Sequence, residues 1–179
     1  RAVSQEIVDR AERAGLIAAM VPKSYGGDGL GFDVLCETAR ILARGDASAA
    51  WTIAFLIEHN WLACHLHLDA QQELFADRHA VTIAGALAPT GTGEKVDGGY
   101  LVKGRWRYNS ASANSDWIII GALVQEQDEQ VPYAFLIPKA DLDVHDDWFM
   151  SGMSATSSVT VSSEGVLVPD RFAIEIELF

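Results

Sequence analysis

The sequence predicts an α+β fold: an N-terminal α-helical domain followed by a mainly antiparallel, β-barrel-like domain. In the first part of the chain, apolar residues recur at helical spacing, as in residues 3–20 and 33–44. From Val81 onwards they alternate as in strands, and turn residues separate the runs. Helices followed by strands indicate an α+β layout. We therefore expect one domain over residues 1–78 and a second over residues 79–179.

Four helices are expected in the first domain. The first covers residues 3–20 and stops before Pro22, because the residue before a proline avoids the helical region. The others are expected at residues 33–44, 49–66 and 69–75. The third of these four is apolar on nearly all sides, which is typical of a buried helix.

The second domain is expected to be built from short strands and turns. Asp97 and Gly98 lie between two apolar runs and indicate a hairpin. Residues 90–93 (TGTG) are expected to form a loop, and residues 125–130 (QEQDEQ) a solvated connection. The expected strands cover residues 81–87, 94–96, 100–103, 117–124, 133–138 and 158–168.

Composition narrows the possible partners. The chain has 179 residues, of which 49% are hydrophobic, so it can bury a substantial core. The net charge is −12 and no segment concentrates Lys or Arg, which disfavours nucleic acid and anionic membranes as partners. No apolar run reaches the roughly 18 residues that a membrane span needs. The first residues also lack the apolar centre of a signal peptide, so a cytoplasmic location is expected.

Cysteine and histidine residues give no sign of a metal site. Cys36 and Cys64 lie in apolar helical segments and are expected to be buried free thiols. His65 and His67 are two residues apart, and side chains at that spacing on a helix face different directions. We therefore expect no bound metal.

Trp51 and His59 stand eight residues apart in the helix expected over residues 49–66. Eight residues make about 2.2 helical turns, so the two side chains are expected on roughly the same face. The residues alone leave two interpretations open: both side chains line a pocket, or both belong to the core.

Four segments, taken in order, resemble the acyl-CoA dehydrogenase superfamily of flavoproteins. They are PKSYGG at residues 22–27, the helical segment that leads to Trp51, GGYLVKGRWRYNSASANSDW at 98–117, and WFMSGMSATSSVTVSSEGVLVPDRF at 148–172. The resemblance implies an acyl-CoA dehydrogenase-like helical domain and β domain. Full-length members also carry a C-terminal four-helix bundle, which we expect to be absent from this chain because the chain stops at Phe179.

Two activities compete within this family. The dehydrogenases oxidise acyl-CoA thioesters with FAD, whereas the two-component monooxygenases take reduced flavin from a separate reductase and use oxygen. The run LAPTGTG at residues 87–93 resembles the Ala-Pro-Thr-Gly of the monooxygenases, and so does the Trp51–His59 spacing. The resemblance thus favours an oxygenase component that hydroxylates a small aromatic compound with reduced FAD or FMN and O2. An acyl-CoA dehydrogenase and a non-catalytic fragment that only binds or associates remain alternatives.

The resemblance also implies roles for individual residues. Trp51 and His59 would line the substrate pocket, and His59, with a pKa near neutrality, would accept a proton from a phenol. Ser110 falls where the family places a hydroxyl facing the central-ring nitrogen of the flavin, so His59 and Ser110 are the catalytic candidates. The expected flavin contacts are Ala86, Leu87, Ala88, Thr90, Tyr108 and Ser110.

Two positions depart from the family's pattern. Ala111 stands where a glycine is usual, and residues 154–157 (SATS) stand where Arg-Gly-Thr-Gly is common. Both departures bear on contacts with the flavin. The implied partners are a small-molecule substrate, a separate flavin reductase and, at full length, further copies of the chain in a homotetramer.

Overall fold

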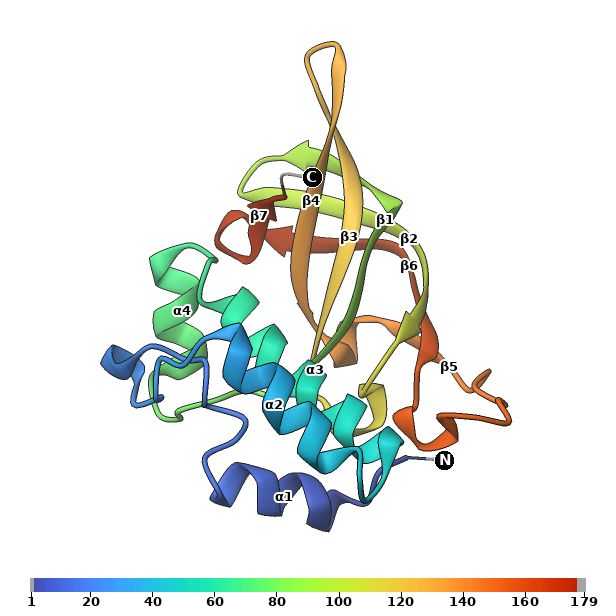
Figure 1. Cartoon of the computed structure of the whole chain (residues 1–179). Coiled ribbons are helices and arrows are strands. Elements are labelled where there is room, and N and C mark those ends of the chain that lie inside the picture. Colours follow the sequence, from blue (N-terminus) through green and yellow to red (C-terminus); the bar gives the residue numbers. More distant parts are fainter. Residues whose placement is uncertain (1, 177–179) are drawn as a thin grey trace.

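The computed structural model describes residues 2–176 and places helices at one end of the molecule and strands at the other (Figure 1). The helices gather below the strands, and one long hairpin projects away from them. The α-helices are α1 (Gln5–Arg13), α2 (Phe32–Leu42), α3 (Ala47–Ala63) and α4 (Leu68–Phe75). The α+β fold predicted from the sequence is confirmed.

The first helix is shorter than predicted. α1 ends at Arg13, although the apolar spacing continues to residue 20. Gly15 has a φ of 78°, in the left-handed region where helices stop, and turns follow it. The buried helix α3 begins at Ala47, two residues before the expected start, because the Asp46 carboxylate accepts a hydrogen bond from the Ala49 N–H at 2.7 Å and caps the helix.

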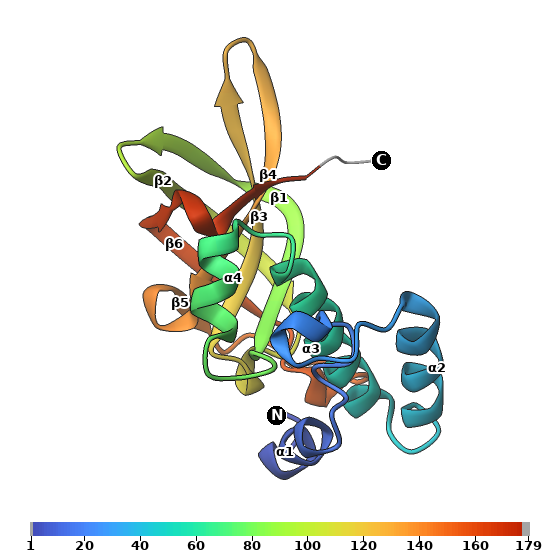
Figure 2. The same ribbon diagram turned by 90° about the vertical axis from the view of Figure 1, so that its left-hand side faces the viewer.

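Seven strands form one mixed sheet in the order β5-β6-β2-β1-β3-β4-β7. Only β1 and β3 pair in parallel among the described strands, so the mainly antiparallel prediction is confirmed. The views agree that β3 and β4 cross β2 and β6 steeply, so the sheet is strongly coiled (Figure 2). The strands are β1 (Ile83–Val96), β2 (Gly99–Asn109), β3 (Trp117–Glu126), β4 (Glu129–Pro138), β5 (Asp143–His145), β6 (Val159–Pro169) and β7 (Ala173–Glu175).

One expected loop is instead part of a strand, and the exposed connection expected over residues 125–130 is shorter than predicted. Residues 90–93 continue β1 and pair with β3 after register shifts around Pro89. Gly91 is needed there, because a Cβ on it would lie 2.3 Å from the ring of Trp106. At the projecting hairpin, β3 and β4 stay paired as far as Glu126 and Glu129, which leaves a turn of two residues.

One hydrophobic core runs through both parts of the chain, from Val8 and Leu56 among the helices to Ile119 and Phe135 among the strands. Asn60 of α3 also ties the parts together: its amide exchanges two hydrogen bonds with the backbone of Val81, at 2.7 and 2.9 Å. The predicted boundary at residues 78 and 79 lies between α4 and β1, and a division into two domains there stays a prediction.

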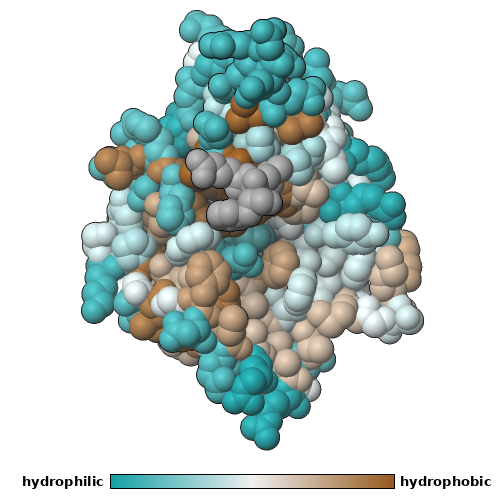
Figure 3. Space-filling view, turned by 45° about the horizontal axis from the view of Figure 1, so that its top comes forward, coloured by the Kyte–Doolittle hydropathy of each residue, from teal (hydrophilic) through white to brown (hydrophobic). Residues whose placement is uncertain are grey.

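The surface mixes hydrophilic and hydrophobic residues. In Figure 3 hydrophilic residues gather at the top of the view, and hydrophobic patches lie below them. Within residues 2–176, none of the helices combines the length and the apolar character required to cross a membrane.

Candidate active site

One face of α3 carries a row of three aromatic side chains. Trp51, Phe55 and His59 follow one another at four-residue steps, with ring centroids 4.8 Å and 5.1 Å apart. The prediction that Trp51 and His59 share a helix face is therefore confirmed. Phe55 was missed by the sequence reasoning, although its spacing from both residues could have revealed it.

Trp51 joins α3 to the sheet. Its indole N–H donates a hydrogen bond to the Ser110 Oγ at 3.0 Å. Ser110 follows the end of β2 and forms an isolated antiparallel bridge with Gly85 of β1. The start of α3, the end of β2 and the start of β1 therefore meet at Ser110.

A cavity of about 310 Å³ opens at this meeting point. Its walls combine aromatic rings with hydroxyl groups, and the Tyr108 and Trp148 rings lie edge to face with centroids 6.2 Å apart. Its volume lies at the lower end of the range for small-molecule sites. Three residues selected from the sequence, Trp51, Tyr108 and Ser110, meet here. The full lining is Trp51, Tyr108, Ser110, Trp148, Met153, Thr156 and Ser158.

The backbone around this cavity is strained. Among residues 2–176, five non-glycine residues have positive φ; two of them line the cavity and two more directly follow or precede lining residues in the sequence. They are Tyr108 (67°), Ala111 (69°), Met153 (54°) and Ser157 (48°). Such conformations cost about 1–3 kcal/mol each and persist where the surroundings enforce them, often at functional sites. Glycine adopts the left-handed backbone found at Ala111 without strain, which agrees with the glycine that the family resemblance leads us to expect at this position.

Within the cavity wall, three buried hydroxyls form a chain of hydrogen bonds. Ser110 Oγ lies 2.9 Å from Ser158 Oγ, which lies 2.7 Å from Thr156 Oγ1. Thr156 Oγ1 then donates to the Met153 carbonyl at 2.9 Å. The sequence reasoning missed Thr156 and Ser158, and the only available signal was a polar run at the family's Arg-Gly-Thr-Gly position.

His59 lies away from the cavity and contributes nothing to its lining. It is 3% exposed, and its Nδ1 lies 2.9 Å from the Ile83 carbonyl. Because a carbonyl only accepts, Nδ1 carries the hydrogen and Nε2 the lone pair. Burial lowers the pKa of His59 to about 4, and the bond to Ile83 opposes this shift only in part. The expected near-neutral pKa is therefore wrong.

The other expected flavin contacts lie elsewhere along β1. Leu87 lines a separate cavity of about 170 Å³ with Trp61 and Ile119. The Thr90 hydroxyl donates to the Arg105 carbonyl at 3.2 Å. Ala86, Leu87, Ala88 and Thr90 are thus not part of the lining around Tyr108 and Ser110, and their role as flavin contacts stays a prediction.

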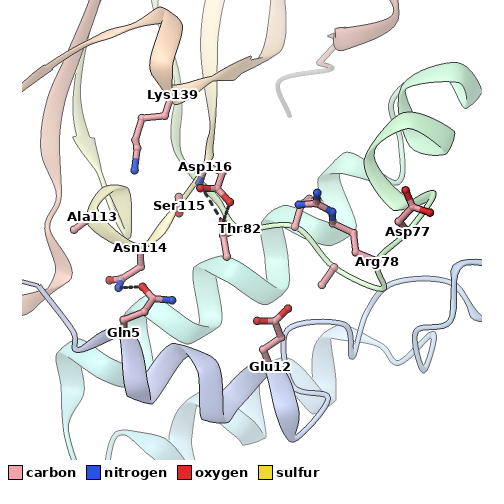
Figure 4. A pocket seen from close by; sticks show the side chains of 12 residues that line it. Gln5, Glu12, Asp77, Arg78, Thr82, Ala113, Asn114, Ser115, Asp116 and Lys139 are labelled. Atoms are coloured by element: carbon pink, nitrogen blue, oxygen red, sulfur yellow. Dashed lines mark hydrogen bonds between the residues drawn. The ribbon is translucent and has the colours of Figure 1, made fainter.

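A larger cavity, of about 570 Å³, lies between α1, residues 77–82 and the 3₁₀ turn Ser112–Asn114 (Figure 4). Acidic and basic side chains surround it, including Glu12, Arg78 and Lys139. No residue selected from the sequence as a site residue lines it. We therefore take the cavity at Ser110 as the candidate site.

Comparison with known proteins agrees with this fold. The family described as "Acyl-CoA dehydrogenase, N-terminal domain" matches residues 1–76. XiaF from Streptomyces sp., solved in complex with FADH2 and glycerol, superposes with a TM-score of 0.89 at 30% identity, over 97% of this chain and 44% of that chain. The chain belongs to the acyl-CoA dehydrogenase superfamily.

Other members of the acyl-CoA dehydrogenase superfamily extend the similarity. A pigment production hydroxylase of Rhodococcus sp. (strain ATCC 21145) is 36% identical over 171 residues, 95% of this chain and 44% of that protein. The oxygenase component of an FADH2-dependent resorcinol hydroxylase of Rhizobium sp. (strain MTP-10005) is 29% identical over 157 residues, 87% of this chain and 38% of that protein. The chain thus spans less than half the length of these relatives.

Proposed function

We propose that this chain is part of the oxygenase component of a two-component flavin-dependent monooxygenase that hydroxylates a small aromatic compound. The observation that carries the proposal is the convergence of Trp51, Tyr108 and Ser110 on one cavity. The names of two similar proteins, a pigment production hydroxylase and an FADH2-dependent resorcinol hydroxylase, support the same reaction class.

The residues present fit a flavin ring. The Trp51, Tyr108 and Trp148 side chains offer aromatic surfaces, and the Ser110 hydroxyl adds a polar contact. When bound, reduced flavin supplies the electrons with which oxygen is activated. Tyr108 would pack against the ring and help to keep water away from it. Ser110 would hold a hydrogen bond to the ring, and the indole of Trp51 fixes the position of that oxygen.

His59 is the weaker of the two catalytic candidates. A base with a pKa of about 4 accepts a proton from a phenol poorly, and the imidazole is buried behind Phe55. These features support the core interpretation, in which His59 joins α3 to Ile83 of β1. Its role as a proton acceptor or as a substrate contact is kept only as a hypothesis.

The partners follow from the same proposal. A separate reductase would deliver the flavin, since the resorcinol hydroxylase relative is named as an oxygenase component. FADH2 appears in the names of that relative and of the XiaF complex, so we propose FAD, with FMN as the alternative. We also propose a cytoplasmic homotetramer for the full-length protein, which light scattering and cell fractionation would test.

Oxygen uptake in the full-length protein tests this function. We expect oxygen consumption and a hydroxylated product when reduced FAD or FMN is supplied with a phenol or indole, and none with oxidised flavin alone. Reduction of a dye by an acyl-CoA, without any reductase, would replace the proposal with a dehydrogenase. Flavin binding without turnover in either assay would favour the non-catalytic alternative.

A further inference from the structure

The hydrogen bonds among the wall hydroxyls share one direction when Thr156 donates to the Met153 carbonyl. Thr156 donates its only hydroxyl hydrogen to the Met153 carbonyl, so it can only accept from Ser158. Ser158 has then used its own hydrogen and must accept from Ser110. The Ser110 oxygen in turn accepts from the indole N–H of Trp51. Every donor therefore points the same way, from Trp51 towards Met153.

This direction decides what Ser110 offers to the cavity. When Thr156 donates to Met153, the Ser110 hydrogen is used by Ser158, so the oxygen presents a remaining lone pair and no hydrogen. A ligand with an N–H or O–H group can donate to that lone pair. A ligand with only an acceptor atom cannot form a hydrogen bond with Ser110 until the direction of these hydrogen bonds is reversed.

Reversing the direction of these hydrogen bonds requires little change in structure. Thr156 Oγ1 lies within hydrogen-bond distance of both Met153 O and Ser158 Oγ, at 2.9 and 2.7 Å, so rotation of its O–H bond is enough. The Met153 carbonyl would still accept from the Thr156 N–H at 3.1 Å and from the Trp148 indole at 3.2 Å. No buried polar group is left without a partner, which is the main cost of breaking such a bond.

We propose that Thr156 and Ser158 are positioning residues that decide whether the Ser110 hydroxyl accepts a hydrogen bond from the ligand or donates one to it. When Thr156 donates to Met153, Ser110 accepts from the ligand; in the reversed direction Thr156 donates to Ser158, Ser158 to Ser110, and Ser110 to the ligand. This rests on the proposed flavin site. The central-ring nitrogen of a reduced flavin carries a hydrogen, whereas that of an oxidised flavin is an acceptor. The direction in which Thr156 donates to Met153 therefore fits reduced flavin, and the reversed direction fits oxidised flavin.

The test compares two dissociation constants in the full-length protein. FAD and dithionite-reduced FAD are titrated anaerobically into wild type and Thr156→Val, and the ratio of the oxidised to the reduced Kd is taken. Valine cannot accept a hydrogen bond from Ser158. The Ser158 hydroxyl therefore donates to the Ser110 oxygen, and the Ser110 O–H bond rotates to point into the cavity. We expect the ratio to fall about 3- to 10-fold, as for the gain or loss of one hydrogen bond.

Thr156→Ser is the matched control, because it keeps the hydroxyl and should keep the wild-type ratio. If Thr156 were merely structural, Thr156→Val would weaken the binding of oxidised and reduced FAD by the same factor. An unchanged ratio of the two dissociation constants in Thr156→Val would therefore overturn the inference. If Thr156→Val does not fold, Ser158→Ala tests the same point, since it also frees the Ser110 hydrogen and should lower the ratio. Failure of wild type to bind either form would overturn the flavin site, and this inference with it.

Discussion

The indole N–H of Trp51 donates a hydrogen bond to the hydroxyl oxygen of Ser110, 59 residues away in the sequence and 3.0 Å away in the structure. This bond joins the first turns of α3 to the end of β2. It also holds an indole that is 46% exposed against the mouth of the candidate cavity. The position of Ser110 at the site thus depends on the helical part of the chain as well as on the sheet.

Trp51→Phe should separate this hydrogen bond from aromatic packing. The ring that packs on Phe55 is largely retained, but Ser110 loses its donor. We expect a loss of about 0.5–1.5 kcal/mol in the free energy of unfolding, measured with urea. Trp61→Phe is the control, because within residues 2–176 the Trp61 indole has no hydrogen bond. Equal losses in both variants would show that the Trp51–Ser110 bond adds nothing.

The buried His59 should make stability depend on pH. Its pKa falls from 6.5 when exposed to about 4 in the folded state. Between these values the unfolded chain binds more protons than the folded one, so stability is complete above about pH 6.5 and is lost as the pH falls towards 4. The shift corresponds to about 3 kcal/mol.

His59→Gln should remove this part of the pH dependence, since glutamine can donate to the Ile83 carbonyl but does not titrate. The measurement is the free energy of unfolding at pH 7, 6, 5 and 4 in both proteins. The neighbouring Glu58, whose pKa burial raises, is present in both and cancels in the difference. Parallel curves would mean that His59 is not buried in its neutral form.

Ala111→Gly should stabilise the protein or leave its stability unchanged. Ala111 is buried with a φ of 69°, and a left-handed backbone costs a non-glycine residue about 1–2 kcal/mol. Glycine relieves that cost but adds about 0.5–1 kcal/mol of unfolded-state entropy. Ala122→Gly is the control: Ala122 is equally buried in β3 without positive φ, and it should lose stability. Thermal unfolding of both variants checks this, and a clear destabilisation by Ala111→Gly would refute the strain.

The order of the elements could be predicted because hydrophobic spacing is a local property. Where the loop prediction at residues 90–93 failed, a contact distant in sequence decided the outcome. Residues 90–93 are of types common in turns, yet they belong to a strand because Gly91 packs against the ring of Trp106. Local spacing also missed the end of α1, where one left-handed glycine outweighs the apolar pattern that continues beyond it.

The site was predictable only in part, for the same reason. Family resemblance selected Trp51, Tyr108 and Ser110, and these three line one cavity. No local pattern shows that Ser158 meets Ser110, because the pairing of β6 with β2 brings the two together from 48 residues apart; Thr156 then bonds to Ser158. The depth at which His59 is buried depends on how α3 packs on β1, so its pKa could not be read from the sequence.

The most direct test of the proposed site is an anaerobic titration of the full-length protein with reduced FAD, comparing wild type with Tyr108→Ala. Tyr108 is 55% exposed beside the cavity and is proposed to pack against the flavin ring. Loss of one base-stacking aromatic residue typically costs about 1–3 kcal/mol, so we expect affinity to fall about 5- to 100-fold. Tyr133→Phe, a change on β4 away from the cavity, should bind reduced FAD as wild type does. Unchanged affinity in Tyr108→Ala would contradict the placement of the flavin at this cavity.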